Sequence, residues 1–196
     1  MELPEVIERL NDWSASADAA GTTRIENKFV HKQQASNNFV VRVAPLGPAR
    51  PDEHLGEFAF DPAHPYHFEH AQDHVPGMML IEAGRQLSMA IAHLYYQVSF
   101  EAVFVLKQMV SSFARFADLG APVFFHSGVS DLDYRRNRVT AMSLSGRFIQ
   151  NGEVLGELSG RWTMIERQLL ERMLRLRGRP EARESETRQS TAVVAE

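Results

Sequence analysis

Apolar and polar residues alternate along much of the chain, with the period of two that is typical of half-buried β-strands. The segments with this alternation, or with runs of β-branched and aromatic residues, are 29–31, 39–43, 55–60, 101–117, 121–133 and 137–165. Asn151 and Gly152 interrupt the last segment, and this pair favours the two-residue turn of a hairpin. We therefore expect residues 137–165 to form two strands.

One stretch has a helical period instead. Residues 76–96 are apolar nearly all round, and Pro76 stands at the first turn, where its missing N–H costs nothing. One apolar stripe of this helix consists of Leu80, Gly84, Leu87, Ile91 and Leu94. Such a helix is buried, so charged residues on it are costly unless they are paired or used. A single buried helix with a large antiparallel sheet predicts an α+β layer architecture.

The two ends of the chain differ from this central part. Residues 3–13 have the spacing of a short amphipathic helix, and 166–177 have the pattern of a helix of mixed charge. Residues 178–196 lack aromatic side chains, and we expect them to be mobile. The expected division is an N-terminal helix and linker (1–23), a central domain (24–165), and a C-terminal helix and tail (166–196).

Composition narrows the classes of function. A chain of 196 residues that is 44% hydrophobic fits one domain with appendages. A net charge of −4 gives no general attraction to nucleic acid or to anionic membranes, and we expect neither as a partner. The absence of cysteine excludes disulfides, thiol catalysis and cysteine zinc sites. Because the sequence shows no secretory signal and no apolar run long enough for a membrane span, we expect a cytoplasmic protein.

The residues with chemical potential gather just before the apolar helix and on it. Four histidines occupy the preceding loop: His64, His67, His70 and His74. Glu82, Arg85 and Gln86 follow on the helix. Glu82 and Arg85 can form an intrahelical ion pair, but on so apolar a helix we favour a functional carboxylate. Gln86 either contacts substrate or hydrogen-bonds a neighbouring strand.

The histidine loop allows more than one role. His67, His70 and His74 have a spacing that can bind zinc, but we favour a histidine acting as a base or hydrogen-bond partner and expect no metal. Asp73 precedes the helix, where it can cap the N-terminus, favour the positive end of the helix dipole, or contact substrate.

These same residues resemble the signature of a known family. The motif His70-x-x-Asp73-His74-Val75-Pro76-Gly77-Met78-x-Leu80-x-Glu82-Ala83-x-Arg85-Gln86 is similar to that of the A-factor biosynthesis hotdog family, whose members make butyrolactone or butenolide signalling molecules in actinomycetes. Val30-His31-Lys32 resembles the Val-His-Arg that opens hotdog halves in that family. A weaker likeness runs to the hotdog 3-hydroxyacyl-carrier-protein dehydratases, whose helix also opens with Pro-Gly and carries Glu-Ala-x-x-Gln.

The resemblance implies a hotdog fold and an enzyme without a cofactor. Its substrate would be an acyl thioester, of an acyl carrier protein or of coenzyme A, with a β-ketoacyl group favoured. In the favoured reaction, a small hydroxylated acceptor attacks the thioester, and family members that make signals use a three-carbon phosphorylated acceptor. Glu82 accepts the hydroxyl proton, Arg85 binds the acceptor's anionic group or orients Glu82, and the helix amides that begin at Gly77 polarise the thioester oxygen.

Other reactions stay open. In a dehydration, His70, or His67 or His74 in its place, removes the α-proton of a 3-hydroxyacyl thioester, and Glu82 protonates the leaving hydroxyl. Thioester hydrolysis and a non-catalytic acyl-binding role are further alternatives. Arg85 favours transfer, because dehydratases that resemble this sequence carry a small or apolar residue at that position.

The length of the chain has a consequence for assembly. Members of the family that make the signals usually carry two hotdog halves in tandem, and this chain has room for one. We therefore expect a homodimer with its active sites at an isologous interface.

Overall fold

The structure is a computed structural model that describes residues 3–18, 25–64 and 72–177. Its helices are α1 (Leu3–Asp18), α2 (Gly77–Tyr95) and α3 (Arg167–Arg177), with short 3-10 helices η1 (Asn27–Val30) and η2 (Ala35–Asn37). Its strands are β1 (Val40–Pro45), β2 (Glu53–Phe58), β3 (His74–Val75), β4 (Ala102–Phe113), β5 (Ala117–Asp118), β6 (Val123–Arg135), β7 (Arg138–Gln150) and β8 (Glu153–Glu166).

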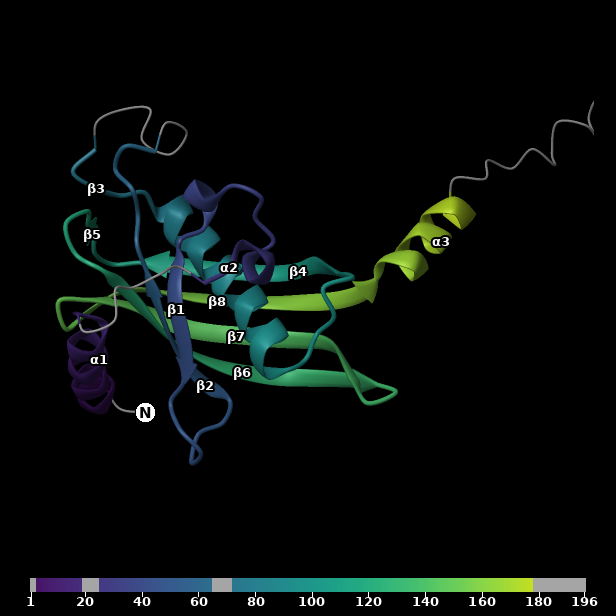
Figure 1. The fold of residues 1–196 in the computed structure, drawn as a ribbon, viewed down its shortest axis with the longest axis horizontal. Helices are drawn as coiled ribbons and strands as arrows, with labels where there is room; N and C mark the ends of the chain where they lie inside the picture. Colours follow the sequence, from purple (N-terminus) through teal and green to yellow (C-terminus); the bar gives the residue numbers. More distant parts are fainter. Residues whose placement is uncertain (1–2, 19–24, 65–71, 178–196) are drawn as a thin grey trace, which may run out of the picture.

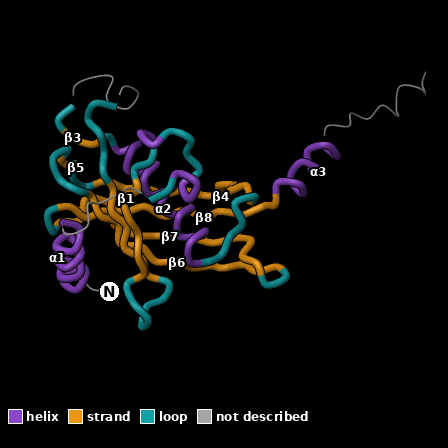
Figure 2. Tube along the Cα trace, viewed as in Figure 1, coloured by secondary structure: helices purple, strands orange, loops and turns teal. Residues whose placement is uncertain are grey.

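Six strands form one antiparallel sheet in the order β1-β2-β6-β7-β8-β4, and β3 pairs with β5 separately. Helix α2 lies across one face of this sheet (Figures 1 and 2). This is a hotdog fold of the α+β class, which confirms the fold expected from the sequence. The hairpin expected at residues 151–152 is also confirmed, because Asn151 and Gly152 have φ of 53° and 77° between β7 and β8.

Helix α2 lies close to the sheet because glycines on the helix and on the sheet each leave room for a leucine of the other element. A Cβ atom at Gly84 would overlap Leu158 of β8, and one at Gly56 of β2 would overlap Leu87. Leu87 and Ile91 are fully buried in the core, together with Phe125 of β6. The side of α2 opposite this stripe faces away from the sheet, and there it can carry polar side chains.

Helix α1 packs on the sheet through a second, smaller core. Val6 and Leu10 of α1 are buried against Leu55, Phe124 and Ile149. Leu55 precedes Gly56 along β2, and Gly56 faces Leu87 of α2, so Leu55 faces the opposite side of the sheet. Helix α3 extends from the opposite end of the sheet, away from the body of the protein (Figure 1).

Two expectations about local structure were wrong. Residues 29–31 were expected to form a strand, but 27–30 form η1 and His31 ends it in a left-handed conformation with φ of 53°. The Lys32 amide donates to the Asn27 carbonyl, so local turn hydrogen bonds outweigh the β propensity of Phe29 and Val30. Residues 14–18, expected in a linker, continue α1, which is consistent with the high helix propensity of alanine at two of these positions.

Among the helices of the described residues, none is long and apolar enough to cross a membrane.

Candidate functional site

The site centres on the side of α2 that faces away from the sheet. Glu82 and Gln86 lie on this side, one turn apart, and His93 follows two turns later. The segment 25–39, which contains η1 and η2, packs over this side of the helix. Each of these three α2 side chains bonds to that segment.

Glu82 is the carboxylate at the centre of an ion-pair cluster. Arg85 grips it in a bidentate manner, with Nε 2.6 Å from Oε2 and Nη2 2.7 Å from Oε1. Lys32 reaches the same carboxylate from the covering segment, with Nζ 2.7 Å from Oε1. Gln86 Nε2 donates a further hydrogen bond to Oε1 at 3.0 Å. The intrahelical ion pair that the spacing allowed is therefore present, and a second cation joins it.

The cluster determines the protonation of Glu82. Burial alone would raise the pKa of this carboxyl, but Arg85, Lys32 and Gln86 outweigh it and lower the pKa to about 2. Glu82 is therefore ionised at neutral pH, and both of its oxygens accept hydrogen bonds from neighbouring donors. A carboxylate with so low a pKa is a weak proton acceptor unless the two cations that contact it form ion pairs with another anion.

Gln86 holds the covering segment against α2. Its amide oxygen accepts from the Phe39 amide at 2.9 Å, and its Nε2 donates to the Asn37 carbonyl at 2.8 Å. The side chain is fully buried. This geometry fits the structural alternative for Gln86 and also places its amide against Glu82.

Lys32 is a member of the cluster that sequence reasoning missed as a site residue. It lies fifty positions before Glu82 in the chain, so no helical spacing joins the two. The available signal was the Val30-His31-Lys32 likeness, which put a basic residue where the family's pattern has an arginine. That likeness pointed to the start of a hotdog half and not to a ligand of Glu82.

The start of α2 forms a second part of the site. Pro76 is the N-cap residue of α2 and makes no side-chain cap hydrogen bond. Its carbonyl accepts from the Met79 and Leu80 amides, so the Gly77 and Met78 amides are the first-turn donors left without a partner among the described residues. A cavity of about 310 Å³ opens beside Gly77, between His74 and the aromatic rings of Phe113 and Phe116. Its walls are largely apolar side chains, and unpaired helix amides at one end suit a carbonyl or an anion.

His74, which lines this cavity, is hydrogen-bonded to Asp73. His74 Nδ1 lies 2.7 Å from Asp73 Oδ1, and the hydrogen bond from His74 lowers the pKa of Asp73. The N-cap position of α2 belongs to Pro76, so Asp73 does not hold the capping position that was one role expected for it. The His74 ring packs on that of Phe116, with ring centroids 4.5 Å apart.

The remaining loop candidates, His67 and His70, lie outside the described residues. Within the described ranges, no group of three or more His, Cys, Asp or Glu side chains could hold a metal ion.

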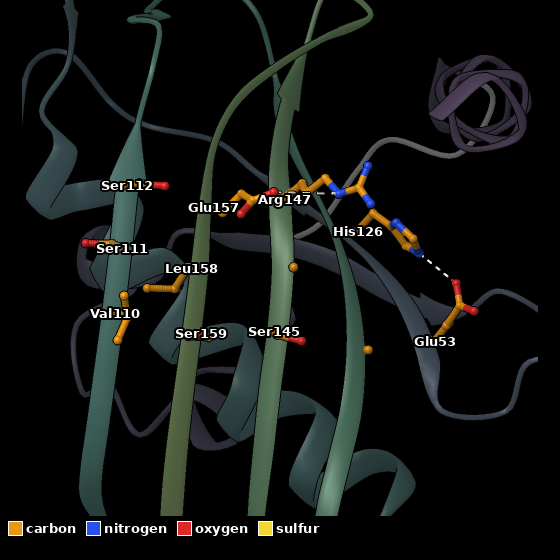
Figure 3. Close-up of a pocket in the computed structure, with 12 residues that line it drawn as sticks. Glu53, Val110, Ser111, Ser112, His126, Ser145, Arg147, Glu157, Leu158 and Ser159 are labelled. Atoms are coloured by element: carbon orange, nitrogen blue, oxygen red, sulfur yellow. Dashed lines mark hydrogen bonds and ion pairs between the residues drawn. The ribbon is translucent and has the colours of Figure 1, made fainter. Parts of the chain in front are cut away.

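A separate groove of about 450 Å³ lies on the sheet (Figure 3). Three of its lining residues lie side by side on neighbouring strands: His126 of β6, Arg147 of β7 and Glu157 of β8. The His126 ring lies 2.8 Å from the Glu53 carboxylate, within hydrogen-bond distance. Leu158 contacts α2, so its neighbour Glu157 faces the other side of the sheet. This groove is therefore separated from the Glu82 cluster by the sheet, and its charged side chains pair with one another.

Residues 13–166 match the family described as the A-factor biosynthesis hotdog domain. The chain belongs to this family. A relative from Streptomyces virginiae, 2-oxo-3-(phosphooxy)propyl 3-oxoalkanoate synthase, is 36% identical over 83 residues. That match covers 41% of this chain and 26% of the relative, so the chain aligns with about a quarter of the length of that synthase.

Solved structures of low sequence identity also align with this A-factor biosynthesis hotdog domain. A hot-dog-like protein from Thermanaerovibrio acidaminovorans is 13% identical and has a TM-score of 0.49, over 64% of this chain and 90% of the other. A mutant thioesterase from Pseudomonas aeruginosa is 12% identical with a TM-score of 0.48, over 64% and 81%.

Proposed function

We propose that this protein transfers a 3-oxoacyl group from a thioester, of a carrier protein or of coenzyme A, to the hydroxyl of a small phosphorylated acceptor. The observation that carries the proposal is the Lys32–Glu82–Arg85 cluster on a buried helix. Two cations meet one carboxylate there, which leaves a formal excess of positive charge. The relative from Streptomyces virginiae is named for a product that joins a phosphooxy group and a 3-oxoalkanoate, which supports this choice of substrates.

In this mechanism Arg85 and Lys32 bind the phosphate of the acceptor. Arginine suits a bidentate contact with phosphate, and lysine adds a point charge. Both cations then share their charge with the phosphate, so their hold on Glu82 weakens. Because burial by itself raises the pKa of Glu82, the carboxylate becomes a better proton acceptor when the acceptor is bound. Glu82 then takes the proton of the attacking hydroxyl.

The thioester is proposed to bind at the start of α2. The amides that begin at Gly77 can donate to the thioester oxygen and stabilise the charge that develops there. The apolar cavity beside Gly77 has side chains suited to the acyl chain, including those of Leu80 and Phe113. The new ester bond forms between the acceptor oxygen and the acyl carbon, the carbon–sulfur bond breaks, and the thiol leaves with a proton.

Dehydration is the second candidate, because His74 lines the same cavity. It would need a 3-hydroxyacyl thioester, the removal of its α-proton by a loop histidine, and no phosphorylated acceptor. Arg85 and Lys32 have no role in that reaction, so the cluster favours transfer.

A product assay separates these reactions. The purified protein is incubated with a 3-oxoacyl or a 3-hydroxyacyl thioester, with and without dihydroxyacetone phosphate, and the products are identified by mass spectrometry. We expect a phosphorylated ester from the 3-oxoacyl thioester only when the acceptor is present. An enoyl product without acceptor would establish dehydration, and free acid in equal amounts under all conditions would establish hydrolysis.

A further inference from the structure

The covering segment 25–39 is tied to α2 at a point that the proposed reaction does not use. Gln86 bonds to the segment at Asn37 and Phe39, and Glu82 bonds to it at Lys32. The third tie joins two histidines, whose Nε2 atoms lie 2.8 Å apart: His31 of the segment and His93 of α2.

The direction of this hydrogen bond follows from the partners of His93. Its Nδ1 lies 2.7 Å from the Val98 carbonyl oxygen, which can only accept, so Nδ1 carries the proton. Burial lowers the pKa of His93, which keeps the ring neutral and leaves Nε2 as an acceptor. His31 Nε2–H is therefore the donor in the histidine pair.

His93 is a rigid anchor for this bond. Only 8% of its surface is exposed, and its ring stacks on Phe100 with centroids 4.5 Å apart and an interplanar angle of 20°. The Val98 carbonyl that it contacts belongs to the turn after α2, where the Val98 amide in turn donates to Ala92. The hydrogen bond to His93 therefore fixes His31 relative to the C-terminal part of α2.

The anchored residue precedes Lys32 directly. His31 has a left-handed backbone, with φ of 53°, and the next amide closes the turn onto Asn27. The direction in which the Lys32 side chain leaves the segment therefore depends on how His31 is held. Lysine has a long flexible stem that loses much rotamer entropy when it is fixed, so its contact with Glu82 is sensitive to the position of its backbone.

We propose that His31 and His93 are positioning residues that hold Lys32 at the anionic group of the acceptor. The proposal rests on the proposed function for the identity of that acceptor, but the positioning of Lys32 against Glu82 can be tested without turnover. The pair acts through Lys32, and neither histidine takes part in bond making.

The first test measures the titration of the Glu82 carboxyl by carbon-13 NMR. The variant His93→Phe keeps an aromatic ring against Phe100 and removes the hydrogen bond to His31. We expect it to raise the midpoint of the Glu82 titration, as Lys32→Ala does, because the carboxylate loses one of its cations. In the double variant the midpoint should equal that of Lys32→Ala alone, because both changes remove the same contact. His126→Phe, which changes a histidine on the far side of the sheet, should leave it unchanged.

The second test measures steady-state kinetics with dihydroxyacetone phosphate. We expect His93→Phe to raise KM for this acceptor about fivefold to tenfold, the effect of losing one hydrogen-bond contact, with kcat and the KM for the thioester near wild type. If wild-type protein forms no ester, the proposed function fails and the NMR titration still decides the positioning role.

Several results would overturn the inference. One is a Glu82 midpoint that Lys32→Ala raises and His93→Phe leaves in place. Another is a His93→Phe effect that adds fully to that of Lys32→Ala. If His93→Phe does not fold, as judged by circular dichroism, then His31→Phe removes the same hydrogen bond from the more exposed side and must give the same shift.

Discussion

At the scale of single residues, Glu82 is a carboxylate that its neighbours keep ionised. Three side chains keep it ionised, with a pKa of about 2, on a helix whose other face is buried. A carboxylate bound in this way holds the side chains of Arg85 and Lys32 close to each other. In the proposed reaction, an anionic acceptor engages those cations and leaves the same carboxylate next to the acceptor hydroxyl.

We expect Glu82→Gln to abolish turnover while the fold remains intact. Glutamine keeps the shape and the hydrogen bonding of the side chain but cannot accept the proton, and loss of such a group typically costs about 10²–10⁴-fold in rate. Turnover and melting temperature are measured on the same preparation. Retention of more than about a tenth of wild-type activity, well above that expected loss, would show that the catalytic centre lies elsewhere.

Arg85→Ala should weaken use of the phosphorylated acceptor more than binding of the thioester. A charge-assisted hydrogen bond contributes roughly 1.5–3 kcal/mol, so KM for the acceptor should rise by one to two orders of magnitude. Arg147→Ala, on the other face of the sheet, is the matched control. Equal changes in the two KM values would mean that Arg85 serves the helix and not the acceptor.

At the scale of elements, the C-terminal end of α2 packs on β2 through a buried histidine. His54 is fully buried, and its ring lies 4.8 Å from that of Tyr95. Burial lowers the pKa of His54 from its usual 6.5. The neutral ring is therefore the form that this contact between α2 and β2 accepts.

This burial predicts how stability depends on pH. Because the pKa of His54 is lower in the folded chain than in the unfolded chain, its contribution is fully present above pH 6.5 and is lost as pH falls below that value. We expect His54→Phe to flatten the fall of melting temperature below pH 6.5, measured by scanning calorimetry. An unchanged slope would show that His31, His93 and His126, whose pKa values are also lowered, account for all of it.

At the scale of the whole molecule, the sheet ends in an edge strand that has solvent-exposed apolar side chains. β4 is the last strand in the described sheet, and Leu106 and Val110 on it are 47% and 55% exposed. Unpaired backbone groups next to exposed apolar side chains favour pairing with another strand. A hotdog domain of one half would gain its second half in this way.

We therefore expect a homodimer formed through β4, with the sites at the interface. Val110→Glu should shift the protein to a monomer in light scattering and reduce its activity, because a charge in an apolar interface is costly. Tyr134→Glu, at a residue that is 60% exposed on β6, serves as the control and should leave the dimer intact. A wild-type monomer with full activity would contradict the assembly.

The sequence by itself determined much of the fold and part of the site. Its alternating segments identified the long strands, its apolar helix identified α2, and the spacing of Glu82 and Arg85 put both on one face of that helix. These are local properties, set by the period of a helix or a strand.

Only the tertiary structure decided the rest. Lys32 meets Glu82, and His31 meets His93, because the segment 25–39 packs over α2, and no local period relates residues fifty or sixty positions apart. The same packing gives Glu82 its low pKa, since burial and a cation from a distant segment act on it together.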